Sequence, residues 1–244
     1  MSILVLYDTE TTGLNPAAGD DICQFAAVVH RQGEPVENTL EVSTLANPGK
    51  PIPPDAGHIH GITDADVANA PPAEEIVRDF WKEIIDFAAG DVIILGGHNT
   101  EFDLRFLEKH VKIPNTTRHI CTMRLARRYE PTAKNHKLEY LYREFYKLPS
   151  HRTLKAHDAL SDVWMSFELL QYWMTTKNKR FYAEVAAELL EPVFLETMPF
   201  GKHKGTAFSN LPQQYLKWLA NQIDGQMDAD VLHTARAYCH SYAY

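Results

Sequence analysis

The sequence predicts an α/β fold in which helices flank a mixed β-sheet, with a small C-terminal module after it. Three short segments rich in β-forming residues follow one another in the first 45 positions, and helical periodicity then alternates with another short apolar segment. A chain of 244 residues has room for one large domain and an appendage. We therefore expect a main domain over residues 1–178, a connecting helix over 179–191 and the module over 192–244.

The expected elements follow from apolar spacing and from turn residues. Gly33-Glu34-Pro35 predicts a hairpin turn, and apolar residues at spacings of three and four predict a helix over 73–89. Asn99 is a good N-cap for the helix that follows the fourth strand and runs to about residue 110. The expected strands are 3–7, 22–30, 36–45 and 92–95, and the other expected helices are 122–129, 137–147, 158–174 and 181–190. Residues 46–72 are expected to form a loop, and the module to contain a strand near 200 and a helix after Pro212.

The charge of the chain is unevenly distributed. The net charge of −8 argues against a nucleic-acid partner. However, residues 101–155 hold 13 Lys/Arg against 6 Asp/Glu, whereas residues 1–100 hold 4 against 16. The basic stretch is either an ordinary solvated surface or a surface that follows phosphates, with Arg124, Arg127, Arg128, Lys134, Lys137, Arg152 and Lys155 as the candidate contacts.

Cysteine usage and hydropathy indicate the compartment. Cys23, Cys121 and Cys239 are odd in number and far apart, which argues against a disulfide framework and a cysteine-built zinc site. No apolar segment approaches the roughly 18 residues of a membrane span, and the first one reaches Asp8 too soon for a signal peptide. We expect a cytoplasmic protein with no membrane partner.

Asp8 and Glu10 form the first cluster of candidate functional residues, just past the first expected strand. In an extended chain, residues two apart point to one face, so the two carboxylates would lie together. Clustered carboxylates repel each other and are costly to desolvate, and a bound cation relieves both effects. An ordinary surface pair is the alternative.

The second cluster ends at Asp103, in the first turn of the helix after Asn99. An acid there is favoured by the helix dipole, which is a purely structural explanation. Phe102 and Phe106 are four residues apart and mark the core face, so Asp103 would lie beside the core. Structural and functional interpretations stay open at this position.

The third cluster contains His157 and Asp162. Five positions correspond to about 140° on an ideal helix, so the two side chains cannot share a helical face. They can meet only if His157 lies in the loop before the helix, with Asp158 near the N-cap. A structural histidine is the alternative.

Together the clusters resemble the DEDDh branch of the DEDD exonuclease superfamily, which has a ribonuclease H-like fold. The first motif is Asp8-Thr9-Glu10-Thr11-Thr12-Gly13, the second is Asn99 with Phe102-Asp103, and the third is His157 with Asp162. His60-Gly61-Ile62-Thr63 resembles the loop between the first two motifs, and the resemblance covers about residues 1–175. Gln24-Phe25-Ala26-Ala27 is similar to exonuclease I, whereas the tail from Met198 and the overall length resemble the exodeoxyribonuclease X family.

This resemblance implies a 3′–5′ exonuclease that acts on DNA 3′ ends and releases 5′-mononucleotides. It implies that Asp8, Glu10, Asp103 and Asp162 hold two divalent ions and that His157 is the general base. Oxygen ligands favour Mg²⁺, or Mn²⁺ as its substitute, over zinc. The implied substrate-binding residues are Thr11, Leu14, His60, Asn99 and Phe102, with Phe102 either stacked on a base or part of the helix core.

Other functions remain compatible with the sequence. The same five residues would serve an exoribonuclease, because they do not distinguish sugars. A non-catalytic nucleic-acid-binding protein and a polymerase proofreading subunit are further alternatives. The C-terminal module either aids substrate engagement through Lys202 and Lys204 or caps the nuclease.

Overall fold

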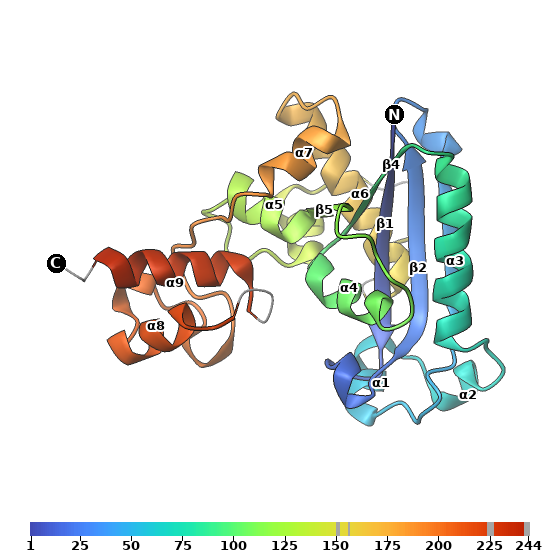
Figure 1. Ribbon diagram of the computed structural model, residues 1–244, viewed down its shortest axis with the longest axis horizontal. Helices are drawn as coiled ribbons and strands as arrows, with labels where there is room; N and C mark the ends of the chain where they lie inside the picture. Colours follow the sequence, from blue (N-terminus) through green and yellow to red (C-terminus); the bar gives the residue numbers. More distant parts are fainter. Residues whose placement is uncertain (150–151, 156, 224–226, 242–244) are drawn as a thin grey trace. The chain divides into compact units, whose positions relative to one another are not determined.

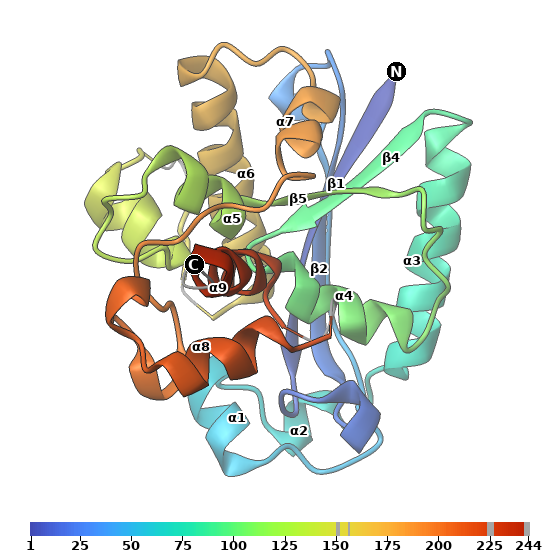
Figure 2. The same ribbon diagram turned by 60° about the vertical axis from the view of Figure 1, so that its left-hand side comes forward.

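The computed structural model describes residues 1–149, 152–155, 157–223 and 227–241, and it contains a five-stranded mixed sheet (Figure 1). The strands lie in the order β3-β2-β1-β4-β5. β1 pairs antiparallel with β2 and β2 antiparallel with β3, whereas β4 is parallel to β1 and to β5, as Figure 2 shows. The strand bounds are Ser2–Thr11, Ile22–Arg31, Leu40–Leu45, Val92–Gly97 and Arg118–Cys121 for β1 to β5. The mixed sheet flanked by helices confirms the predicted fold class.

Helices cover both faces of this sheet. Ile3, Val5 and Tyr7 of β1 belong to a core cluster with the helices α3, Ala73–Ala88, and α4, Thr100–Glu108. The alternate residues Leu4 and Leu6 are fully buried and point the other way, towards α6, Ala159–Thr176, which packs on β1 and β2. β1 is therefore buried on both sides, and its far end emerges between α4 and α6.

Several elements differ from the prediction because they are short. The expected strand 36–45 begins with a 3₁₀ turn, Val36–Asn38, and only Leu40–Leu45 is a strand. The expected loop 46–72 contains two helices, α1, Pro54–His60, and α2, Asp64–Val67. The strand β5 was not predicted, and the expected helix 137–147 is a π-helical turn, Tyr140–Phe145. The helices α5, Thr122–Tyr129, and α7, Tyr182–Glu188, lie where they were predicted.

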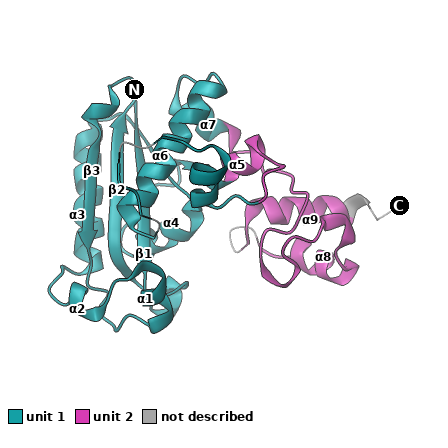
Figure 3. Ribbon diagram, turned by 180° about the vertical axis from the view of Figure 1, so that it is seen from behind, with its two compact units in different colours: residues 1–123, 135–187 teal, residues 124–134, 188–244 magenta. Residues whose placement is uncertain are grey.

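The chain divides into two compact units (Figure 3). Unit 1 comprises residues 1–123 and 135–187, and unit 2 comprises residues 124–134 and 188–244. Unit 2 therefore includes α5 from Arg124 onward, which the predicted boundaries did not foresee. Its other helices are α8, Gln213–Ala220, α9, Ala229–Ser241, and the 3₁₀ turns Gly201–His203 and Phe208–Asn210. The strand expected near residue 200 is instead a 3₁₀ turn flanked by a single bridge between Thr197 and Ala207.

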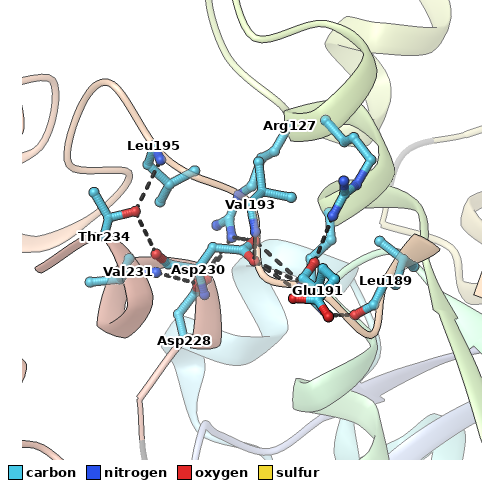
Figure 4. Close-up of polar contacts among 11 residues, drawn as sticks. Arg127, Leu189, Glu191, Val193, Leu195, Asp228, Asp230, Val231 and Thr234 are labelled. Carbon is cyan, nitrogen blue, oxygen red and sulfur yellow. Dashed lines mark hydrogen bonds and ion pairs between the residues drawn. The ribbon is translucent and has the colours of Figure 1, made fainter. Parts of the chain in front are cut away.

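A buried ion-pair network holds α5 and α9 together within unit 2 (Figure 4). Asp230 is fully buried, and its carboxylate accepts hydrogen bonds from Arg124 Nη2 at 3.0 Å and from Arg127 Nη1 at 2.8 Å. The backbone N–H of Val193 donates to the same carboxylate at 2.9 Å, and Arg127 also pairs with Asp228 at 2.9 Å. Arg124 and Arg127 were expected to follow nucleic-acid phosphates. That interpretation is wrong for these two residues, because their guanidinium groups are engaged inside the protein.

Within the described residues, no helix combines the length and apolar character that a bilayer span requires.

Candidate active site

The far half of β1 brings Asp8 and Glu10 to one face of the sheet. They continue the row of Leu4 and Leu6, which faces α6, whereas Thr9 points to the opposite face, where α4 packs. Glu10 is 9% exposed, so the pair lies in a largely dry environment and is not an ordinary surface pair.

Asp103, in the first turn of α4, is buried and oriented by β1. Its Oδ1 accepts hydrogen bonds from the Thr9 backbone N–H at 3.0 Å and from the Thr9 hydroxyl at 2.7 Å. Both bonds end on the same oxygen and fix the direction of the carboxylate. The prediction that Asp103 lies beside the core is confirmed, but the sequence reasoning missed Thr9. Its position between Asp8 and Glu10, on the opposite face of the strand, was the available signal.

The start of α6 supplies His157 and Asp162. His157 precedes the helix in the left-handed region, with φ at 58°, and Asp158 is the N-cap, as predicted. The carboxylate of Asp158 accepts hydrogen bonds from the Ser161 backbone N–H and from its hydroxyl, at 3.2 and 2.7 Å. The backbone N–H of His157 in turn donates to Asp162. An unusual backbone conformation held by these contacts is a common feature of functional sites.

The three elements converge on one cluster. A ring nitrogen of His157 and carboxylate oxygens of Glu10 and Asp162 all lie within 4.8 Å of one another. Asp8 belongs to the same cluster, because the charges of Asp103 and Asp162 act on its carboxyl group. All five residues that the sequence singled out for catalysis are thus brought to one place in unit 1.

The carboxyl groups of this cluster strongly perturb one another. Burial and the charges of Asp162 and Asp103 raise the pKa of Glu10 to about 8. Burial, together with neighbouring carboxylates, also raises the pKa values of Asp8 and Asp162. Burial raises the pKa of Asp103 although the Thr9 hydrogen bonds act in the opposite direction. The four acids cannot all ionise without a countercharge, and all of their donor atoms are oxygens. Both properties fit hard divalent cations such as Mg²⁺.

Two further residues shape the site, and the sequence reasoning did not find them. Gln24 pairs with Glu10 across β1 and β2, and its amide donates to Asp158 and accepts from the Ala159 N–H, both at 3.3 Å. Gln24 therefore ties the start of α6 to the sheet. Gly97 ends β4, and a Cβ there would lie 2.6 Å from the Tyr7 carbonyl oxygen. Only glycine permits the close approach of β4 to β1 at this point.

The residues proposed to bind a terminal nucleotide surround the end of β1. Leu14 is 79% exposed, whereas Thr11 is buried and its hydroxyl donates to the Gly13 carbonyl at 2.7 Å. His60 is buried, and its Nδ1 accepts the Ile62 N–H at 3.0 Å. Burial lowers the pKa of His60, a hydrogen bond to the Thr11 carbonyl opposes this shift, and the charge of His157 adds to it. His60 therefore lies next to the catalytic cluster, and its burial there disfavours the charged imidazolium.

Asn99 and Phe102 lie at the start of α4. Asn99 occupies the N-cap position, but it has φ at 68° and its side chain makes no capping hydrogen bond, so the predicted capping role is wrong. Asparagine tolerates this left-handed conformation better than other non-glycine residues do. Phe102 is half-buried, with its ring centroid 5.2 Å from that of Phe106. It thus combines core packing with a partly exposed ring.

Comparisons with known sequences identify one relative that matches nearly the whole chain and others that match parts of it. The sequence model of the family described as exonuclease, RNase_T, matches residues 5–170. A second model, QSregVF_b, whose description refers to quorum-sensing-regulated virulence factors, matches residues 186–225. Exodeoxyribonuclease 10 of Escherichia coli (strain K12) is 31% identical over 240 residues, which cover 97% of this chain and 98% of that protein. A DNA polymerase III subunit epsilon-like protein of Rhodobacter capsulatus is 48% identical over 105 residues, which cover 43% of this chain and only 14% of that protein.

Comparisons with solved structures give the same fold. Exonuclease X, solved in complex with 5′-overhanging duplex DNA, has a TM-score of 0.57 and 31% identity, covering 77% of this chain and 99% of that one. Exonuclease I of E. coli, solved with a dT13 oligonucleotide, has a TM-score of 0.57 at 20% identity, covering 73% of this chain and 42% of that one. The second likeness concerns the fold alone.

Proposed function

The chain belongs to the exonuclease family, and we propose that it is a metal-dependent 3′–5′ exodeoxyribonuclease that releases 5′-mononucleotides. The observation that carries this proposal is the cluster of four carboxylates and one histidine at the end of β1. Composition and fold are shared with many other proteins, whereas this cluster has a specific chemical use.

Asp8, Glu10, Asp103 and Asp162 would hold two Mg²⁺ or Mn²⁺ ions. Such ions, when bound, lower the pKa of an attacking water and offset the charge that develops on the leaving 3′-oxygen. The raised carboxyl pKa values support this assignment, because burial first and the neighbouring carboxylates second disfavour the ionised acids in the absence of a countercharge. The two hydrogen bonds from Thr9 hold Asp103 in a fixed orientation for this task.

His157 would act as the general base. Its ring lies next to Glu10 and Asp162, yet it is exposed, so a proton taken from water can pass on to solvent. A positioned base of this kind contributes about 10²–10⁴-fold to the rate. The N-cap Asp158 and the bridging Gln24 hold the segment that presents the ring.

The substrate end would lie against the turn that follows β1. The backbone of Thr11 and the exposed Leu14 would hold the terminal nucleotide, and Phe102 would stack on the next base. His60 would support this turn through the Thr11 carbonyl, and Asn99 would shape the start of α4. Stacking and backbone contacts accept every base, as an exonuclease requires.

The preference for DNA rests on a relative of full length. The E. coli protein that matches 97% of this chain is called an exodeoxyribonuclease, and the solved exonuclease X holds duplex DNA.

The domain boundaries proposed above, 1–178, 179–191 and 192–244, assign the whole catalytic cluster to the first segment.

Digestion of matched DNA and RNA strands tests the proposed function. Each strand carries a 3′ label and is incubated with the wild type and with Asp8→Asn, in Mg²⁺ and in excess EDTA. We expect label release from DNA by the wild type in Mg²⁺ alone, and loss of this activity in the variant. Faster release from RNA would make the protein an exoribonuclease, and undiminished turnover in EDTA would contradict the metal-dependent mechanism.

A further inference from the structure

Unit 2 carries three aromatic rings in a row. Two of them belong to α8 and the third to the 3₁₀ turn Gly201–His203. The ring centroids of His203 and Tyr215 are 4.4 Å apart, and those of Tyr215 and Trp218 are 5.5 Å apart, with the latter two rings stacked at 20°. Tyr215 and Trp218 are three residues apart and therefore share one helix face. Trp218 is 51% exposed, which is unusual for so large an aromatic side chain.

Trp218, at the end of this row, lies outside the core of unit 2, whereas Tyr215 packs against that core. The hydrophobic residues of α8 that fill the core are Leu216 and Leu219, which are 1% and 0% exposed. Trp218 is not among the residues of that core. The stability of the unit therefore does not account for a tryptophan at this position.

The surroundings of the row are basic. Residues 197–223 contain no Asp or Glu, although the chain has 32 of them. Lys202, Lys204 and Lys217 are exposed, and no ion pair of theirs is found in the described part of the chain. Asp228 and Asp230 of the same unit are already neutralised by Arg124 and Arg127. The three ammonium groups are thus available to an anionic partner.

We propose that this surface binds single-stranded DNA. It is called the aromatic–basic face and consists of Lys202, His203, Lys204, Tyr215 and Trp218. Bases would stack on the exposed ring of Trp218 and on the partly exposed rings of Tyr215 and His203, and the lysines would contact phosphates. This combination binds single strands without sequence preference. A protein partner fits this surface less well. Exposed ammonium groups beside stacked rings suit the charged backbone and flat bases of a nucleic acid.

The inference rests on the proposed function for its choice of DNA. It deepens that function by giving unit 2 a substrate-binding role. An exonuclease works at one end of a strand, and a second binding surface would retain the strand between hydrolysis steps. Each stacked base contributes a factor of about 5 to 150 in affinity.

Binding of oligothymidylate to the full chain in EDTA tests the proposal without hydrolysis. Indole fluorescence is informative because Trp164 and Trp173 are buried and Trp81 packs partly buried against the core of unit 1, whereas Trp218 is 51% exposed. We expect oligothymidylate to quench the wild-type fluorescence, and Trp218→Ala to lose this quenching and at least 5-fold in affinity. Phe194→Ala is the matched control, because Phe194 is an equally exposed aromatic residue of the same unit, 51%, and stacks on Tyr238 instead.

A second variant tests the phosphate contacts. Replacing Lys202 and Lys204 together by Ala should lower the slope of log affinity against log salt by about 1.4, since each phosphate contact on a single strand contributes about 0.7. The double variant of Lys82 and Lys112, two exposed lysines of unit 1, should keep the wild-type slope.

The outcomes separate this inference from the proposed function. Wild-type affinity, quenching and salt slope in folded variants of the aromatic–basic face would overturn the inference, even if the enzyme hydrolyses DNA normally. Oligothymidylate binding that depends on Trp218, in a protein that hydrolyses nothing, would support the inference and contradict the proposed function. A dimer that Trp218→Ala dissociates, with unchanged oligothymidylate affinity, would assign the face to a second copy of the chain and overturn the proposal.

Discussion

Replacing Glu10 by Gln should stabilise the metal-free protein. The pKa of Glu10 is raised by burial and by Asp162 and Asp103, from an ordinary value of 4.5 to about 8. Between these values the folded protein keeps a proton that the unfolded chain releases, so the free energy of unfolding falls as pH rises. For a single group the loss amounts to about 1 kcal/mol near pH 5 and about 4 kcal/mol near pH 8. Glutamine removes the titration and keeps the size of the side chain.

Urea unfolding in EDTA, near pH 5 and near pH 8, measures this effect. We expect Glu10→Gln to exceed the wild type by about 4 kcal/mol at the higher pH and by much less at the lower one. Glu83→Gln, on the exposed face of α3, should change stability by less than about 0.5 kcal/mol. Saturating Mg²⁺ should stabilise the wild type more than Glu10→Gln, because the variant lacks a ligand. A variant no more stable than the wild type near pH 8 would refute the crowding of the four carboxylates.

Three further predictions concern catalysis and stability. His157→Ala should lower single-turnover hydrolysis by about 10²–10⁴-fold while the Mg²⁺-induced rise in Tm persists, and loss of that rise would mean that the histidine is a ligand. Thr9→Val should weaken Mg²⁺ binding, measured by titration calorimetry, by about 10- to 100-fold, because Asp103 loses an orienting hydrogen bond. Unchanged affinity would contradict this role. Asp230→Ala should lower the free energy of unfolding in urea by about 3–5 kcal/mol, because it leaves buried guanidinium groups unpaired. A loss as small as that caused by the exposed Asp79→Ala would show that the network is dispensable.

The residues of the catalytic cluster were predictable because local rules place them. Strand alternation puts Asp8 and Glu10 on one face, and Asp103 follows from the first turn of a helix after a buried strand. The five-residue spacing of His157 and Asp162 requires a loop before the helix, and the structure has one. The encounter of the three segments was inferred from a resemblance to known nucleases, since spacing alone does not give tertiary contacts.

What the sequence did not reveal depends on tertiary contacts. Gln24 bridges to Asp158 from a neighbouring strand, and the similarity of its segment to exonuclease I did not indicate this contact. Arg124 and Arg127 are basic residues on a helix and therefore suggested a phosphate-binding surface, but their partner Asp230 is more than 100 positions away. The short strand β5 and the helices α1 and α2 contain too few residues to show a period.

The central claim is that this site removes nucleotides one at a time from a 3′ end. Its most direct test compares a linear DNA strand labelled at its 3′-terminal nucleotide with a closed circle of the same sequence, both in Mg²⁺. We expect labelled 5′-mononucleotide to be the first product of the linear strand and the circle to stay intact. Cleavage of the circle at a similar rate, or release of the label in longer oligonucleotides, would contradict it.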